Sequence, residues 1–139
     1  MSFVHLYLQT EYSMLQSSCS IDKIFKVASN NKTVSLAMTD EGNMYGAIKF
    51  YKEALKYNIK PIIGLKLNYT CNGINSTILL YAMNNFGYRN LMKLSSKYMI
   101  NDKKIELNDI LSNSIGLLAI IPFLKAYYIN ILLIEILII

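Results

Sequence analysis

The sequence is poor in the residues from which metal and disulfide sites are built. It contains one histidine and two cysteines among 139 residues, and no tryptophan. Cys19 and Cys71 lie far apart, form no Cys-x-x-Cys pair and have no companion histidines. A structural zinc site needs about four nitrogen or sulfur ligands, so this composition argues against one. Two separated cysteines also give no disulfide framework.

An uninterrupted apolar run is missing from the N-terminal segment. Gln9, Glu11 and Gln16 break it, and no basic stretch precedes it. A signal peptide is therefore not expected, and the expected compartment is the cytoplasm.

The last part of the sequence, residues 123–139 (FLKAYYINILLIEILII), is its most apolar stretch. Lys125 and Glu135 interrupt it, so it falls short of the ~18 uncharged residues that a spanning helix needs. Three alternatives remain open for this tail: a strand or helix that covers the sheet, the readthrough of a truncated gene, and a membrane segment. We expect a domain at residues 1–122, followed by this tail.

Hydrophobic residues make up 53% of the chain, which is ample for a packed core. The formal net charge is +5, but the lysines are spread over three separate places. They fall at Lys49, Lys52 and Lys56, at Lys93 and Lys97, and at Lys103 and Lys104. Solvated helix faces explain this pattern better than a nucleic-acid-binding patch.

Strand and helix patterns alternate along the chain. Short apolar runs predict strands at residues 3–8, 34–38, 61–69, 76–83 and 115–121. Helical spacing predicts helices at residues 21–28, 44–55, 88–99 and 107–111. Asn72-Gly73 predicts a tight turn that makes the third and fourth strands a hairpin. This order is typical of an α/β protein with a largely parallel sheet.

Polar clusters follow the first two predicted strands. QTEYS (residues 9–13) ends the first, and TDEGN (residues 39–43) ends the second. Functional residues of parallel sheets sit at the carboxyl ends of strands, so we expect both clusters on the same edge. The sequence therefore places its candidate site there.

Four blocks of the sequence carry a family resemblance. They are FVHLYLQTEYSML, SLAMTDEGNMYGAIKFYKEALKYNIKPIIG, LLYAMNNFGYRNLMKLSS and IGLLAI. In this order and spacing they resemble the N-terminal PHP domains of bacterial DNA polymerase III alpha subunits. The resemblance implies a distorted seven-stranded (β/α) barrel whose mouth holds divalent metals between histidines and carboxylates. A closed barrel of this general kind needs about 250 residues, so we expect only its N-terminal part, too short to close.

The resemblance also locates the family's metal-ligand positions in this sequence. They fall on Tyr7, Gln9, Gln16, Glu41, Lys66 and Thr77. The motif residues that persist are His5, Glu11, Asp40, Gly42 and Asn43, of which His5 matches a leading histidine that is not a principal ligand. As the lone histidine of an apolar strand, His5 is predicted to be a hydrogen-bonded core residue.

These replacements predict a site without metal or other cofactor. Lys66 would put an ammonium where a metal's charge should sit, and two such charges ~4 Å apart repel by several kcal/mol even at an effective dielectric of 20. Glu11, Asp40 and Glu41 leave weak binding of a hydrated Mg²⁺ open. The alternative is that Asp40 caps the following helix or pairs with Lys66.

The resemblance implies a non-catalytic, structural N-terminal portion of a replicative DNA polymerase. Its partners would be the rest of that subunit and the replicative holoenzyme, with DNA contacted only indirectly and no membrane. The carboxylates that hold nucleotide-bound Mg²⁺ in such polymerases have no counterpart here, so no catalytic residue is predicted. Two alternatives stay open: a metal-dependent phosphoesterase or 3′–5′ exonuclease that uses Glu11, Asp40 and Glu41, and a small membrane-associated interaction protein.

Overall fold

The computed structural model describes residues 3–122, which form four helices and four strands. In chain order they are α1 (Ile21–Asn30), β1 (Ser35–Glu41), α2 (Ala47–Lys56), β2 (Lys60–Cys71), β3 (Ile74–Ala82), α3 (Asn85–Ile100), α4 (Leu107–Leu111) and β4 (Leu117–Ile120). The four predicted helices and four of the five predicted strands are confirmed. The predictions for the tail lie outside the described residues.

The strands form one open sheet in the order β1-β2-β3-β4. Only β1 and β2 pair in parallel, while the β2–β3 and β3–β4 pairs are antiparallel. The prediction of a largely parallel sheet is therefore wrong in its pairing, because the β2–β3 hairpin inserts a reversed strand between β2 and β4. The expected fold class is confirmed: an α/β protein whose sheet, over residues 3–122, does not close.

The predicted hairpin turn is confirmed. Cys71 pairs with Ile74, which leaves Asn72 and Gly73 as the two central turn residues. Both have positive φ, 49° for Asn72 and 77° for Gly73. This is the conformation of a type I′ turn, whose twist matches that of the flanking strands.

The first predicted strand, at residues 3–8, is not a regular strand. The segment runs beside β1, where the carbonyl of His5 accepts from Ala37 N (3.1 Å) and that of Leu8 from Thr39 N (2.7 Å). Leu8 N donates to the side chain of Thr39 rather than to a backbone carbonyl, so the ladder is broken. Farther out, the hydroxyl of Tyr81 donates to Leu6 O at 2.7 Å.

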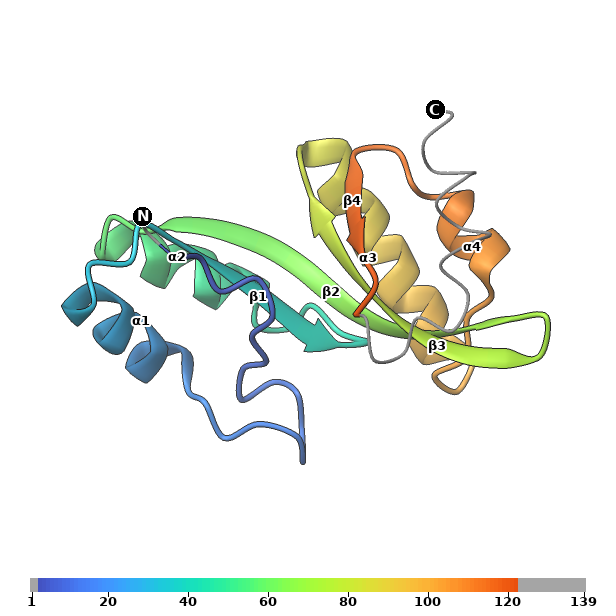
Figure 1. Ribbon diagram of the computed structural model, residues 1–139, viewed down its shortest axis with the longest axis horizontal. Coiled ribbons are helices and arrows are strands. Elements are labelled where there is room, and N and C mark those ends of the chain that lie inside the picture. Colours follow the sequence, from blue (N-terminus) through green and yellow to red (C-terminus); the bar gives the residue numbers. More distant parts are fainter. Residues whose placement is uncertain (1–2, 123–139) are drawn as a thin grey trace.

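The helices pack over β2 in two groups, as Figure 1 shows: α1 and α2 near β1, and α3 and α4 near β3 and β4. The first core cluster lies under α1 and α2 and comprises Ile21, Phe25, Ala28, Leu36, Met38, Ala47, Phe50, Ala54 and Ile59. The second lies under α3 and α4 and comprises Leu65, Leu67, Tyr69, Ile78, Leu80, Leu91, Leu94, Tyr98, Ile105 and Ile110. The two groups of helices thus bury two separate cores along one strand.

Candidate functional site

The predicted site residues gather at the carboxyl end of β1. Asp40 and Glu41 end this strand, and the parallel register places Lys66 of β2 beside Glu41. The polar segment around Thr10 folds back against the same edge, because Leu8 and Thr39 are hydrogen-bonded to each other. The two polar clusters identified in the sequence therefore do meet.

Asp40 is fully buried and is held entirely by the N-terminal segment. Its Oδ1 accepts from Thr10 N (2.6 Å) and from Ser13 Oγ (2.7 Å), and its Oδ2 accepts from Thr10 Oγ1 (2.6 Å). Such charge-assisted bonds compensate for the burial of a carboxylate. Both alternatives predicted for Asp40, capping of the next helix and pairing with Lys66, are wrong, because Thr10 and Ser13 occupy both of its oxygens.

Lys66 pairs with Glu41 instead. Lys66 Nζ donates to Glu41 Oε2 at 2.8 Å, and the two side chains are only 13% and 17% exposed. Asn68 Nδ2 donates to the other oxygen of Glu41 (3.2 Å), and Thr77 Oγ1 donates to Asn68 Oδ1 (2.8 Å). The ring of Tyr7 lies 5.9 Å from Lys66 Nζ, within reach of a cation–π contact. Lys66 therefore does have an acidic partner at this end of the sheet, but the partner is Glu41 and not Asp40.

In the folded chain the pKa of Glu41 is lowered and the pKa of Lys66 is raised from their ordinary values. Burial would raise the pKa of Glu41, but the hydrogen bond and charge of Lys66, helped by Gln16 and Lys103, outweigh burial and lower it. Burial would lower the pKa of Lys66, but its hydrogen bonds to Glu41 and Tyr7 and the charge of Glu41 raise it. Both groups therefore stay charged at neutral pH.

Glu11 is paired with Lys49 of α2. Lys49 Nζ donates to Glu11 Oε1 at 3.0 Å and lies 3.4 Å from Asp22. The hydrogen bond to Glu11 raises the pKa of Lys49. Each of the three carboxylates considered for Mg²⁺, Glu11, Asp40 and Glu41, is thus already bonded to a protein group.

The remaining positions of the N-terminal motif lie on or near the surface. The prediction that His5 is a buried core residue is wrong: its side chain is exposed and meets the ring of Phe3 edge to face at 4.6 Å. The irregular backbone of the segment leaves this side chain outside the core. Gln9 and Gln16, both at predicted ligand positions, are hydrogen-bonded to each other at 3.0 Å.

Gly42 and Asn43 shape the loop that follows β1. Gly42 has φ 70°, and a Cβ there would lie 2.5 Å from the ring of Tyr98, so a side chain does not fit. Asn43 is buried and donates to the carbonyls of Tyr12 and Glu41. These two motif residues therefore hold the loop in shape by local contacts.

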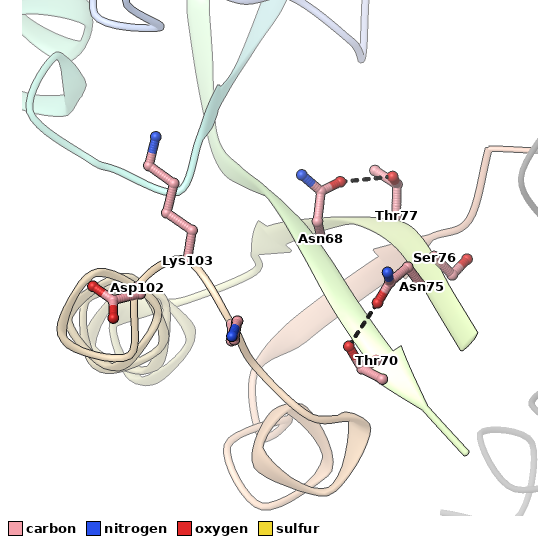
Figure 2. A pocket seen from close by; sticks show the side chains of 8 residues that line it. Asn68, Thr70, Asn75, Ser76, Thr77, Asp102 and Lys103 are labelled. Atoms are coloured by element: carbon pink, nitrogen blue, oxygen red, sulfur yellow. Dashed lines mark hydrogen bonds between the residues drawn. The ribbon is translucent and has the colours of Figure 1, made fainter. Parts of the chain in front are cut away.

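An open polar groove of about 740 Å³ continues from this site along the β2–β3 hairpin. It is lined by Asn68, Thr70, Asn75, Ser76, Thr77, Asp102, Lys103 and Lys104. Figure 2 shows Asn68 bonded to Thr77 and Thr70 to Asn75 across the two strands, with Lys103 on the facing loop. Thr77, a predicted ligand position, therefore lines this groove with its hydroxyl bonded to the side chain of Asn68.

The residues at this site do not fit a divalent metal cluster. Over residues 3–122, no group of three or more histidines, cysteines, aspartates and glutamates converges closely enough to hold an ion. The one imidazole of the sequence, that of His5, lies edge to face against Phe3, and the ammonium of Lys66 is bonded to Glu41. Transition-metal sites need several nitrogen, oxygen or sulfur ligands with lone pairs free to converge.

Thr10 and Ser13 are the functional-site residues that sequence reasoning missed. Both are almost completely buried, and together they hold Asp40. The only available signal was their place in a polar cluster after an apolar run, which does not identify a partner about thirty residues away.

Within residues 3–122, no helix has the length and apolar character that crossing a bilayer requires.

Comparison with known proteins gives a consistent result. A family model of the PHP domain matches residues 5–132. The DNA polymerase III subunit alpha of Ureaplasma parvum is 41% identical over 107 residues, covering 77% of this chain and 10% of that protein. The corresponding subunit of Bacillus subtilis is 37% identical over 131 residues, covering 91% of this chain and 12% of that protein. The chain thus spans about a tenth of the length of these relatives.

The likeness to solved structures concerns the fold. A solved amidohydrolase from Chromobacterium violaceum superposes with a TM-score of 0.51 at 13% identity, over 65% of this chain and 32% of that one. The match to the family model covers most of the chain, and the relatives align with the same region. This chain belongs to the PHP domain family, in the form found in the N-terminal region of bacterial DNA polymerase III alpha subunits.

Proposed function

We propose that this chain is the N-terminal PHP portion of a replicative DNA polymerase III alpha subunit, with a structural role and no catalytic one. The observation that carries the proposal is the bond between Lys66 and Glu41, 2.8 Å long, at two positions where the resemblance places metal ligands. The ammonium of Lys66 stabilises the Glu41 carboxylate there without a metal ion. Three hydrogen bonds from Thr10 and Ser13 do the same for Asp40.

The proposed partners are the polymerase domains of the same subunit and, through them, the replicative holoenzyme in the cytoplasm. The relatives that match this chain are about ten times longer than the matched region. Template-directed nucleotide addition would belong to the rest of such a subunit, so DNA would be contacted only indirectly by this part.

Metal titration tests the non-catalytic role. Calorimetric titration of the purified full chain with Mn²⁺ and Zn²⁺ is expected to show no tight stoichiometric binding. A matched variant restores ligands at four positions: Tyr7→His, Gln9→His, Glu41→His and Lys66→Glu. It is expected to gain affinity, because it supplies imidazoles and removes the ammonium. Two tightly bound ions per wild-type chain would overturn the proposal.

The phosphoesterase or exonuclease alternative finds less support. Such chemistry needs carboxylates free to hold a metal or activate water. Here Glu11 is bonded to Lys49, Asp40 to Thr10 and Ser13, and Glu41 to Lys66 and Asn68. Release of nucleotide from a labelled 3′ end by the wild-type chain, lost in Asp40→Ala, is the result that would favour this alternative.

A further inference from the structure

The polar groove along the β2–β3 hairpin has a strand wall and a loop wall. The strand wall comes from β2 and β3, and the loop wall is the segment between α3 and α4 (Figure 2). The chain turns back in this loop, where Asp102 and Lys103 have positive φ, 51° and 60°. Thr70 N then donates to Ile105 O at 2.9 Å, which fixes the loop against β2. Lys103 and Lys104 are therefore held beside the strand wall.

The hydrogen bonds of the strand wall determine which way its amides face. Asn68 Nδ2 donates to the Glu41 carboxylate, which only accepts, so Asn68 Oδ1 is left to accept from Thr77 Oγ1. Thr70 Oγ1 donates to Asn75 Oδ1 at 2.8 Å in the same manner. Among residues 3–122, Asn75 Nδ2 donates to no acceptor, so both of its hydrogens are available to a ligand.

The loop wall adds two positive charges. Among residues 3–122, neither Lys103 nor Lys104 has a carboxylate within 4.0 Å of its ammonium group. Two acids lie near them. The carboxylate of Glu41 is already bonded to Lys66. Asp102 also lines the groove, but Figure 2 shows its carboxylate pointing away from the two strands. The groove therefore offers donors and positive charge in excess of acceptors.

This excess favours a phosphate group as part of the ligand. A phosphate monoester carries a charge of about −1.5 to −2 at pH 7 and has three strong acceptor oxygens. Two neighbouring ammonium groups match that charge, and hydrogen bonds from charged donors to it are about twice as strong as neutral ones. A carboxylate carries a single charge and would leave one of the two lysines without a partner.

The rest of the groove favours hydroxyl groups on the same ligand. Its volume of about 740 Å³ is in the range of small-molecule sites and leaves room beyond a single phosphate. The 8 residues that line it supply amides, hydroxyls and charges, and none of these lining residues is aromatic. A nucleobase would find no ring to stack on there. Sugar hydroxyls, which both donate and accept, match amide and threonine side chains.

We propose that this groove binds a small phosphorylated sugar or polyol, with its phosphate at Lys103 and Lys104 and its hydroxyls along the strand wall. The binding uses protein groups alone, and no bond of the ligand is broken. This inference does not depend on the proposed function, because a structural and a catalytic PHP portion would carry the same groove.

Calorimetric titration of the purified full chain tests the proposal. The probes are ribose 5-phosphate, inorganic phosphate and ribose, and EDTA is present throughout so that a phosphate held by a metal ion is not measured. We expect ribose 5-phosphate to bind with one site per chain and at least about tenfold more tightly than either of the other probes, because only it engages both walls.

Matched variants locate the site. Lys103→Gln and Lys104→Gln are each expected to weaken binding of ribose 5-phosphate about tenfold, because each removes one charged donor. Lys93→Gln removes the same charge from the exposed side of α3 and is expected to leave the affinity unchanged. Asn75→Asp keeps the shape of the side chain but replaces its donors by acceptors, so it should abolish binding. Asn30→Asp on α1 adds the same negative charge and should have no effect.

Three results would overturn the inference. The first is the absence of binding, which would also be seen if residues 123–139 filled the groove, since the full chain is used. The second is binding of ribose 5-phosphate no tighter than that of inorganic phosphate. The third is equal weakening by Lys103→Gln and Lys93→Gln, which would show only a general attraction to the net positive charge of the chain. None of these results bears on the metal titration that tests the proposed function.

Discussion

At the scale of single residues, the site is organised by hydrogen bonds and an ion pair between protein groups. Asp40 accepts three short bonds from two residues of the N-terminal segment, all at 2.6–2.7 Å. Buried carboxylates without such partners are strongly destabilising. Asp40 therefore fastens the segment that precedes α1 to the end of β1.

The first prediction concerns this fastening. Asp40→Asn removes the charge and turns an amide NH₂ toward one of the donors, so we expect a loss of about 2–3 kcal/mol in the free energy of unfolding. Ser13→Ala removes one donor and should cost about 1 kcal/mol. Urea denaturation measures both. The same losses are expected with and without added Mn²⁺, and a loss that appears only with Mn²⁺ would mean that Asp40 is a metal ligand.

The second prediction concerns pH and the Glu41–Lys66 pair. The pKa of Glu41 is lower in the folded chain than its ordinary value of 4.5, because Lys66 outweighs the effect of burial. The unfolded chain therefore binds a proton at Glu41 before the folded chain does. The stabilisation by ionised Glu41 is present above pH 4.5 and is lost as the pH falls through the folded pKa.

Glu41→Gln checks this linkage. At pH 7 we expect the variant to be less stable by about 1–2 kcal/mol, since it leaves Lys66 without its charged partner. The difference between wild type and variant is expected to shrink toward zero as the pH is lowered below 4.5. Chemical denaturation over this pH range measures it. A difference that is constant with pH would show that the ion pair contributes nothing.

At this scale, family motifs located the residues but did not identify their partners. The sequence indicated an acidic partner for Lys66 but gave it as Asp40, because the strand register that places Lys66 beside Glu41 was not known. The bonds from Thr10 and Ser13 to Asp40 were not predictable, because they cross a loop and a helix and follow no periodicity. The exposure of His5 was also missed, since it depends on how far a strand ladder extends.

At the scale of elements, local patterns were reliable where one pattern dominated and misleading where two competed. Asn72-Gly73 fixes a two-residue turn almost alone, and the hairpin register follows from it. On α2, apolar residues fill two adjacent faces, so the periodicity did not reveal that Phe50 rather than Ile48 faces the core. Residues 3–8 have a strand pattern, but their backbone pairs with β1 at two points only.

The third prediction is at this scale and concerns the hairpin turn. Gly73 has φ 77°, and no atom lies within 4 Å of where its Cβ would be. Gly73→Ala therefore meets no steric clash, and its expected cost of about 1 kcal/mol is purely conformational. Asn72→Gly is the matched control and should cost little, because glycine adopts φ 49° freely. Thermal unfolding of both variants measures the difference, and equal midpoints would contradict the turn conformation.

At the scale of the whole molecule, β2 links two cores that share no buried residue. Among residues 3–122, Ile63 and Met44 are partly buried against both clusters, and no other residue is common to the two. The twelve residues of β2 pair with β1 over their first half and with β3 over their second. Figure 1 shows this strand running from one group of helices to the other.

This arrangement leads to the last prediction, which concerns how the molecule opens. Phe25 lies in the core under α1 and α2, and Leu94 lies in the core under α3, each with at most 1% exposure. Truncation of a buried phenylalanine or leucine to alanine costs about 2–5 kcal/mol. Because each core is closed by its own helices, we expect Phe25→Ala to accelerate amide exchange in α1 and α2 and to leave α3 protected, and Leu94→Ala to do the reverse.

The amides of β2 discriminate between this behaviour and a single cooperative opening. Leu65 is fully buried in the second core, but its backbone lies between Asp40 of β1 and Leu80 of β3. Because β2 has a paired strand on both sides there, the amide of Leu65 should exchange most slowly in the wild type and in both variants. Hydrogen exchange followed by mass spectrometry or NMR resolves the three regions. If either truncation accelerates exchange by the same factor in α1, α3 and β2, the two cores unfold as one unit, and β2 is a passive connection rather than the element on which both depend.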